Sequence, residues 1–444
     1  MMFVLVYFFV ALVCCAIAIA ALNPKARISF FEPGTLFSVV AFSYSVIPLL
    51  AFGFYDGLKS DLSIDSRLGA INPVYEDIVS LGWVHFVLFA TSTFTYLTFR
   101  SRYPALDATT LRTSAADITK IAAVYAGLKG TVWVLLWYFG VSSSSDYLSS
   151  YLALQSLPRL GQQIVVHLGG MATTSAIFFC VALISHPTLR WLVPVWILME
   201  GLLVLLNAGA RTGLFVIALS AVVGFHYLVR RISSPIIAIL ILIGISTFLG
   251  LGAYRDLSGI AAGSDIALQA LIRNEFVSVF INGLDVMRLR EAGLTSEIAS
   301  RIYYADLVNV VPQQLLDSQK LDLSVWYVQT FYPAYAAAGG GLAFGVVPEA
   351  LIGNGLPDAA MRGILLGIAF AVAHAALAGR RNTLWATATY VWILVFAYKV
   401  YRTSTLHLVP VFLLDALPAI VLLAVLIRSA RVSPTVRAQG AKLP

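Results

Sequence analysis

Charged side chains are scarce in this chain. They make up 11% of its 444 residues, whereas a soluble globular protein carries about 25%. Hydrophobic residues make up 59% of the sequence. This composition excludes an ordinary soluble protein and predicts an all-α membrane protein with many spans.

Motifs for metals, nucleotides and disulfides are also missing. The three cysteines are Cys14, Cys15 and Cys180, and their spacing indicates neither a metal-ligand pair nor a disulfide framework. The sequence has no His-x-x-x-His pattern and no Gly-x-x-x-x-Gly-Lys loop, so neither a metal site nor ATP hydrolysis is predicted. We therefore expect no cofactor. The first apolar run has no basic n-region and exceeds the core of a signal peptide, so we do not expect it to be cleaved.

Apolar runs of about 18 residues or more are the units that cross a bilayer as helices. The sixth and seventh candidate runs in this sequence are shorter than the others. We predict eleven spans, at roughly 2–22, 35–54, 78–97, 118–140, 162–184, 191–207, 213–229, 235–253, 359–378, 383–400 and 405–427.

The net charge of +7 does not indicate nucleic-acid binding, because the basic residues in excess lie on one predicted side of the membrane. With the N-terminus outside, the cytoplasmic segments hold 15 basic and three acidic residues, and the outer segments hold 13 basic and 17 acidic residues. Lys129, Glu200 and Asp415 remain within spans. Since basic residues favour the cytoplasmic side, we predict that the N-terminus lies outside and the C-terminus inside.

We predict one membrane domain over 1–444 and one dominant outer loop over 254–358 that contains helical segments. Within this loop, 266–276 mixes apolar and charged positions as an amphipathic helix does. The last part, 331–355, is apolar, but three consecutive glycines and Pro348 oppose an uninterrupted spanning helix. Irregular backbone at membrane depth is tolerated where protein buries it, so we expect a re-entrant or membrane-docked segment that faces outside.

Two arginines separate pairs of apolar runs, and the predicted topology places both at the outer water interface. Arg211 lies between the sixth and seventh spans, and Arg402 lies between the tenth and eleventh. A guanidinium stays charged and offers a planar fork of donors that fits phosphate oxygens. The alternative use of each arginine is an interfacial anchor that reaches into water. Arg273 and Arg301 in the outer loop are further candidates for the same anion.

A general base is expected near these arginines. Glu349, in the glycine-rich segment, is the first candidate, and Glu275 and His407 compete with it. A carboxylate close to the membrane plane is costly to ionise unless it is paired. Structural pairing of Glu349 with an arginine is therefore the alternative use.

The three charges within spans also have two possible uses. Lys129, Glu200 and Asp415 can neutralise neighbouring charges as structural ion pairs, which is the more frequent use, or they can form a proton or ion path. A path of this kind would favour a transporter.

The stretch Ala-Gly-Ala-Arg-Thr-Gly around Arg211, the large outer loop and the glycine-rich element over 339–355 together resemble the Wzy-type polysaccharide polymerases of bacterial surface-glycan assembly. In that family, glycines are followed by a glutamate and then by Asn, an aromatic residue and Gly before a span. Glu349 matches the glutamate, but Asn354 and Gly355 are adjacent, so the aromatic residue is missing. Arg402 lies where the family tends to place another arginine.

The resemblance implies a metal-independent glycosyltransferase of the bacterial inner membrane, with its active site facing the periplasm. The donor would be a growing glycan on undecaprenyl diphosphate, and the acceptor would be one lipid-linked repeat unit. En bloc transfer of the glycan to a sugar hydroxyl would release undecaprenyl diphosphate. The implied partners are these lipid-linked oligosaccharides, the lipid bilayer, a chain-length regulator and other glycan-assembly membrane proteins, without nucleic acid.

The departing diphosphate develops negative charge, which fixed cations in a low-dielectric site can stabilise. The acceptor hydroxyl in turn needs a base. The residues expected in these two roles are the diphosphate-binding arginines Arg211, Arg402, Arg273 and Arg301, and the candidate bases Glu349 and Glu275.

Two alternatives stay open. A flippase for lipid-linked oligosaccharides would work by alternating access, often with internal repeats or helices broken at mid-membrane. The chain shows no repeat, but its charges within spans are compatible with a flippase. An O-antigen ligase would use the same lipid donor and would need a histidine in the outer loop, and 254–358 contains none.

Overall fold

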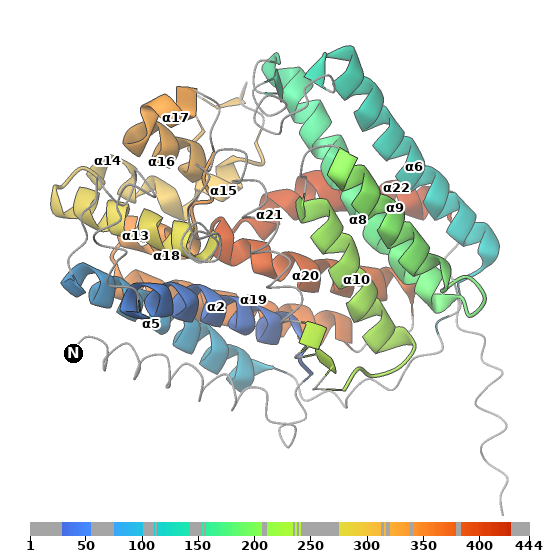
Figure 1. Cartoon of the computed structure of the whole chain (residues 1–444), viewed down its shortest axis with the longest axis horizontal. Coiled ribbons are helices and arrows are strands. Elements are labelled where there is room, and N and C mark those ends of the chain that lie inside the picture. Colours follow the sequence, from blue (N-terminus) through green and yellow to red (C-terminus); the bar gives the residue numbers. More distant parts are fainter. Residues whose placement is uncertain are drawn as a thin grey trace, which may run out of the picture. The chain divides into compact units, whose positions relative to one another are not determined.

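A computed structural model describes most of the chain, and the regular structure of the residues that it describes is helical, without strands (Figure 1). The described ranges, apart from a few isolated residues between them, are 29–54, 75–100, 113–141, 157–206, 211–233, 275–311, 320–337, 341–378 and 383–427. The chain divides into two compact units. Unit 1 comprises Met1–Arg102, Ile232–Val372 and Phe396–Pro410, and unit 2 comprises Tyr103–Arg231, Ala373–Val395 and Val411–Pro444. That the whole chain is one membrane domain stays a prediction.

Unit 1 is organised around one helix of the predicted outer loop. This helix, α13 (Glu275–Glu291), lies against α2 (Pro33–Phe54), α5 (Tyr75–Phe99) and α18 (Val346–Ile352) (Figure 1). Shorter helices complete this part of the unit: α14 (Ser296–Ala299), η3 (Arg301–Tyr303), α15 (Ala305–Val308), α16 (Leu323–Phe331) and α17 (Pro333–Ala337).

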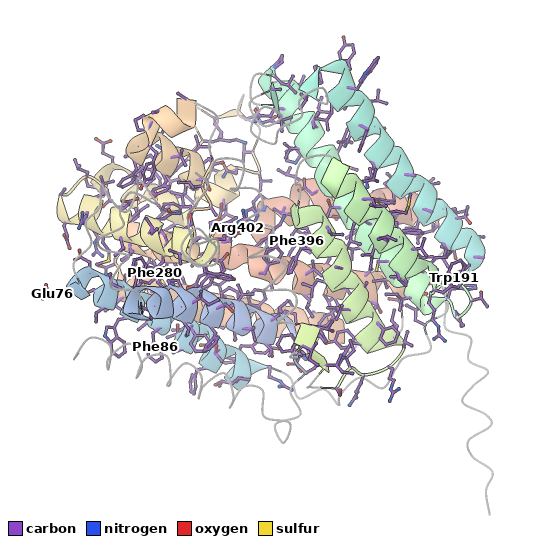
Figure 2. The ribbon with its side chains drawn as sticks, in the orientation of Figure 1. Glu76, Phe86, Trp191, Phe280, Phe396 and Arg402 are labelled. Carbon is purple, nitrogen blue, oxygen red and sulfur yellow. The ribbon has the colours of Figure 1, made fainter. Side chains whose placement is uncertain are left out.

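Helix α13 is buried over 276–286 and forms the centre of the unit 1 core. Phe280, which Figure 2 labels on this helix, stacks on the ring of His85 at a centroid distance of 5.1 Å. Two buried polar residues of α13 have partners from distant segments, although Oδ1 of Asn282 has none among the described residues. The side-chain amide of Asn282 donates to the carbonyl of Ala343, and two tyrosine hydroxyls donate to Asp285. The described part of 254–358 is therefore helical, and its place as an outer loop stays a prediction. Most of the amphipathic segment 266–276 lies outside the described residues.

Unit 2 is built around α8 (Arg159–Ser185), which lies against α6 (Ala115–Tyr138) and α10 (Arg211–Leu228). Ser114 caps α6 by accepting a hydrogen bond from the N–H of Asp117 (3.1 Å). The remaining helices of this unit are α9 (Leu192–Leu206), the π-helical turn η5 (Phe412–Ala416) and α22 (Leu417–Leu426). Helices α19 (Leu356–Ala378), α20 (Leu384–Arg402) and α21 (Leu408–Val411) contribute residues to both units.

Six described helices are long and apolar enough to cross a membrane: Glu76–Phe99, Ala115–Tyr138, Leu160–Ser185, Leu356–Leu377, Leu384–Arg402 and Leu408–Leu426. Shorter apolar helices cover Pro33–Leu49, Leu192–Leu203 and Gly213–Leu228. Together they coincide with nine of the eleven predicted spans, and the sixth and seventh spans are short, as expected. The spans at 2–22 and 235–253 lie outside the described residues, apart from a few at the start of the second. The chain is a helical membrane protein; the number of spans and their orientation stay predictions.

Candidate functional site

The described part of the glycine-rich segment holds a short helix in place of a span. All seven residues of α18 are buried. The preceding Gly345 has a φ of +107°, a conformation that favours glycine, and its N–H donates to the carbonyl of Thr403 (3.1 Å). A Cβ on Gly345 would lie 2.7 Å from Cγ1 of Val279. Close approach to α13 and to the chain that follows Arg402 thus fixes the start of α18.

Glu349 lies in α18 with only 2% of its surface exposed. Its Oε2 accepts hydrogen bonds from the N–H (2.9 Å) and Oγ1 (2.8 Å) of Thr405, and it pairs with Nη1 of Arg362 (2.8 Å). None of the hydrogen bonds between described residues goes to Oε1. The arginine pairing predicted for Glu349 is present, and its role as a general base stays a prediction.

Arg362 is 3% exposed and lies one helical turn after Asp358 in α19. Its Nε donates to Oδ2 of Asp358 (3.0 Å), and its Nη1 also donates to Oγ1 of Thr405 (2.6 Å). The ring centroid of Tyr303 lies 5.4 Å from the guanidinium carbon, within the range of a cation–π contact. Two carboxylates therefore compensate one buried guanidinium.

Burial raises the pKa of Glu349 from 4.5 to about 7. Arg362 and the hydrogen bonds from Thr405 oppose this rise, whereas the nearby charge of Asp306 adds to it. Burial also raises the pKa of Asp306, although its carboxylate accepts a hydrogen bond from the hydroxyl of Ser404 (2.7 Å). At neutral pH Glu349 thus exchanges between its protonated and ionised forms.

Arg402, labelled at the end of α20 in Figure 2, is held by a second carboxylate. Its Nε lies 2.6 Å from Oε1 of Glu275, which also accepts a hydrogen bond from the hydroxyl of Tyr44 (2.9 Å). The side chains of Arg402 and Glu275 are 32% and 16% exposed. Arg402 precedes Thr405 by three residues, a reach of roughly 10 Å at most. The structure therefore brings Arg402, Glu275 and Glu349 to one end of α20.

The three candidate bases differ in their surroundings. His407 is half-buried and lies within the predicted span 405–427. Glu275 is occupied by Arg402 and Tyr44. Because an efficient general base has a pKa near the working pH, Glu349 remains the first choice.

The other predicted diphosphate ligands lie on other segments or outside the described residues. Arg211 is the first residue of α10, but its side chain lies outside the described part of the structure, as does the whole of Arg273. Arg301 begins η3 in unit 1. A diphosphate-binding role for these three arginines stays a prediction.

Four residues of the site were not selected from the sequence: Arg362, Asp358, Asp306 and Thr405. Asp358 and Arg362 did carry a signal, because opposite charges four residues apart on a helix lie on one face and can pair. No local pattern indicates Thr405, which is 56 residues from Glu349 in the chain and reaches it only through the fold.

The charges within the spans of unit 2 are paired. Lys129 Nζ contacts both carboxylate oxygens of Glu200, and the hydroxyl of Tyr125 donates to the same carboxylate. Asp415, on η5, lies 2.8 Å from Nδ1 of His167. The ion pair predicted between Lys129 and Glu200 is present, whereas Asp415 pairs with a histidine.

Within the described ranges, no group of three or more His, Cys, Asp or Glu side chains could hold a metal ion. No family model, no curated protein and no solved structure matches the chain. A functional assignment therefore depends on the chemistry of the site itself.

Proposed function

We propose that this chain is a lipid-carrier glycosyltransferase that polymerises undecaprenyl-diphosphate-linked oligosaccharide repeat units on the periplasmic face of the bacterial inner membrane. One observation carries the proposal: Glu349, a buried carboxylate with a pKa near 7, and Arg402, a partly exposed and held arginine, lie at the same end of α20. The resemblance of 339–355 to the Wzy-type polymerases supports the same activity.

In the proposed reaction, a hydroxyl of the acceptor sugar attacks the anomeric carbon of the donor glycan. A new carbon–oxygen bond forms while the bond from the anomeric carbon to the diphosphate oxygen breaks. The electron pair of the broken bond leaves with undecaprenyl diphosphate. The hydroxyl proton passes to Glu349, which must be ionised to accept it. The glycan moves as one block, so the polymer grows in steps of one repeat unit.

Arg402 is assigned to the leaving group. Negative charge develops on the diphosphate as the bond breaks, and a cation that is already in position stabilises it without further reorganisation. Glu275, which also accepts a hydrogen bond from the hydroxyl of Tyr44, pairs with Nε of the guanidinium and so restricts its orientation before substrate binds. Loss of one donor of this kind costs about 10²–10³ in kcat in well-studied enzymes. Arg211, with Arg273 or Arg301, is proposed to assist.

The alternative function, a flippase for lipid-linked oligosaccharides, rests on unit 2. The observation that favours it is the His167–Asp415 pair on a π-helical turn, because such turns occur frequently at functional sites. Lys129 and Glu200 do not add to it, since they neutralise each other.

The test is to incubate the purified full chain with a defined undecaprenyl-diphosphate oligosaccharide, without added metal, and to separate the products on a ladder gel. We expect wild type to give a ladder and Glu349→Gln to give none. Arg402→Lys should also lose the ladder, because lysine keeps the charge but lacks the planar fork. Asp285→Asn is the matched control: it alters a buried carboxylate of unit 1, and its amide oxygen can still accept from Tyr327 and Tyr332.

Two outcomes would count against the proposal. Ladders of wild-type intensity from both Arg211→Ala and Arg402→Ala would contradict the diphosphate-binding role. Transfer of the lipid-linked oligosaccharide across a liposome membrane without polymer formation would favour the flippase.

A further inference from the structure

Arg362 is buried, yet its hydrogen bonds are incomplete. Its Nε and Nη1 have partners, but its Nη2 has none among the described residues. Oδ1 of Asp358 is also buried and has no hydrogen-bond partner among the described residues. Buried donors and acceptors without partners are costly and rare in folded proteins, and one of each lies on the same ion pair. This coincidence points to a ligand.

The geometry of the ion pair indicates what kind of group fits. A guanidinium and a carboxylate pair most completely through two parallel hydrogen bonds. Asp358 and Arg362 make one of them, from Nε to Oδ2, and leave Nη2 and Oδ1 without the other. A hydroxyl group can join these two atoms, because it accepts from Nη2 and donates to Oδ1.

Charge argues for a neutral hydroxyl over an anion. Three carboxylates lie near the guanidinium: Asp358 and Glu349 pair with it, and Asp306 lies close enough to influence the pKa of Glu349. A second guanidinium, that of Arg290, acts on Asp358, so three carboxylates stand against two cations. A phosphate would meet more negative than positive charge there. A sugar, which is neutral and rich in hydroxyls, would not be repelled.

We propose that Nη2 of Arg362 and Oδ1 of Asp358 form a subsite for a hydroxyl of the acceptor sugar. The inference rests on the proposed function, in which Glu349 removes the proton of an acceptor hydroxyl. Nη1 of Arg362 contacts Glu349, and Nη2 is bonded to the same carbon, so a hydroxyl at Nη2 lies near that carboxylate. The subsite therefore orients the acceptor with its reacting hydroxyl beside the base.

Tyr303 and Gly353 form the boundary of this subsite. Nη2 and Oδ1 are closed to solvent in this structure. Tyr303, whose ring lies over the guanidinium, is 43% exposed, and its side chain must move aside for an acceptor to reach them. A Cβ on Gly353 would overlap Oδ2 of Asp358 and lie 2.8 Å from the hydroxyl of Tyr303. Glycine at this position lets both side chains occupy the boundary.

The test measures binding of the lipid-free repeat-unit oligosaccharide, released by mild acid from the lipid-linked unit of the host, to the purified full chain by titration calorimetry. Asp358→Asn keeps an oxygen for Nε but places an amide donor where Oδ1 stands. We expect its Kd to rise roughly 10- to 100-fold, the range for losing a hydrogen bond to a charged group. Gly353→Ala should weaken binding in the same direction. Asp285→Asn, which alters a carboxylate bonded to Tyr327 and Tyr332, should bind as wild type does.

No binding to wild type, or equal binding to wild type and to Asp358→Asn with unchanged melting temperatures, would overturn the subsite. If Asp358→Asn does not fold, binding of the oligosaccharide to Gly353→Ala and to Tyr303→Ala is measured in its place. Equal binding to wild type and to both variants would then overturn the subsite. Inorganic phosphate competing with the oligosaccharide would overturn the assignment to a hydroxyl. The ladder gel separates the two proposals. Polymerisation without Asp358-dependent binding rejects the subsite alone, and Asp358-dependent binding without polymerisation rejects the proposed function alone.

Discussion

Replacing Glu349 by glutamine should remove a large part of the pH dependence of stability. The pKa of Glu349 is about 7 in the folded chain, against 4.5 for the ordinary side chain, because burial disfavours the charged form. Between these two values the folded chain keeps a proton that the unfolded chain has released. One pH unit corresponds to 1.36 kcal/mol, so wild type loses about 3 kcal/mol of unfolding free energy across this interval.

The sign follows from the direction of the pKa change. A carboxyl whose pKa is raised by folding contributes stability that is complete below the unfolded value of 4.5 and is lost as the pH passes about 7. Glutamine does not titrate and resembles the protonated form, since its carbonyl oxygen can accept from Thr405 and Arg362. We expect Glu349→Gln to be about as stable as wild type at pH 4.5 and about 3 kcal/mol more stable at pH 8.

The measurement is unfolding of the purified chain in one detergent at both pH values, followed by tryptophan fluorescence. Glu297→Gln, an acid-to-amide change at an exposed position, is the control and should follow wild type. The same Glu349→Gln preparation should lose about 10²–10⁴ of its polymerisation rate, because it lacks the base. A stability difference between Glu349→Gln and wild type that is identical at pH 4.5 and pH 8 would refute the raised pKa.

Three further predictions concern the same two units. Because Glu349 must be ionised, kcat/KM of wild type should rise with pH up to about 7 and then level off, and a profile without an inflection there would exclude it as the base. Gly345→Ala should cost about 1–3 kcal/mol in thermal unfolding, because of its positive φ and the valine beside it, whereas Gly127→Ala, with open space around it, should not destabilise the chain. Lys129→Ala or Glu200→Ala alone should cost about 3 kcal/mol, and an apolar replacement of both should recover most of it. That stable double variant should act on lipid-linked oligosaccharides as wild type does, and loss of this activity would show that the pair does more than neutralise charge.

The spanning helices could be predicted because apolar length is a local property of the chain. The burial of helix α13, in the predicted outer loop, could not be predicted in the same way. Over 276–286, α13 carries Asn282 and Asp285, which are typical of an exposed position. Their partners come from distant segments: the carbonyl of Ala343 and the hydroxyls of Tyr327 and Tyr332. Polar residues favour the core of unit 1 only once those partners are in place.

In the candidate site too, some features could be predicted from local sequence and others depend on the fold. Glu349 and Arg402 were conspicuous in the sequence because each is a charge between apolar residues. Arg362 was less conspicuous, since at the start of a predicted span it counted as one more base on the outer side. Which carboxylate pairs with which arginine is a property of the fold, and no spacing in the sequence contains it.

The way the charges are paired explains how a base and a cation can be neighbours without cancelling. A direct ion pair between Glu349 and Arg402 would lower the basicity of the carboxylate and offset the charge that the diphosphate requires. Each has another partner: Arg362 holds Glu349, and Glu275 holds Arg402. The first pair is buried, which brings the pKa of Glu349 close to 7 despite its arginine. The second is partly exposed, which leaves Arg402 within reach of a lipid-borne anion. The proposed chemistry requires this separation, and the turn from Arg402 to Thr405 provides it within one short stretch of chain.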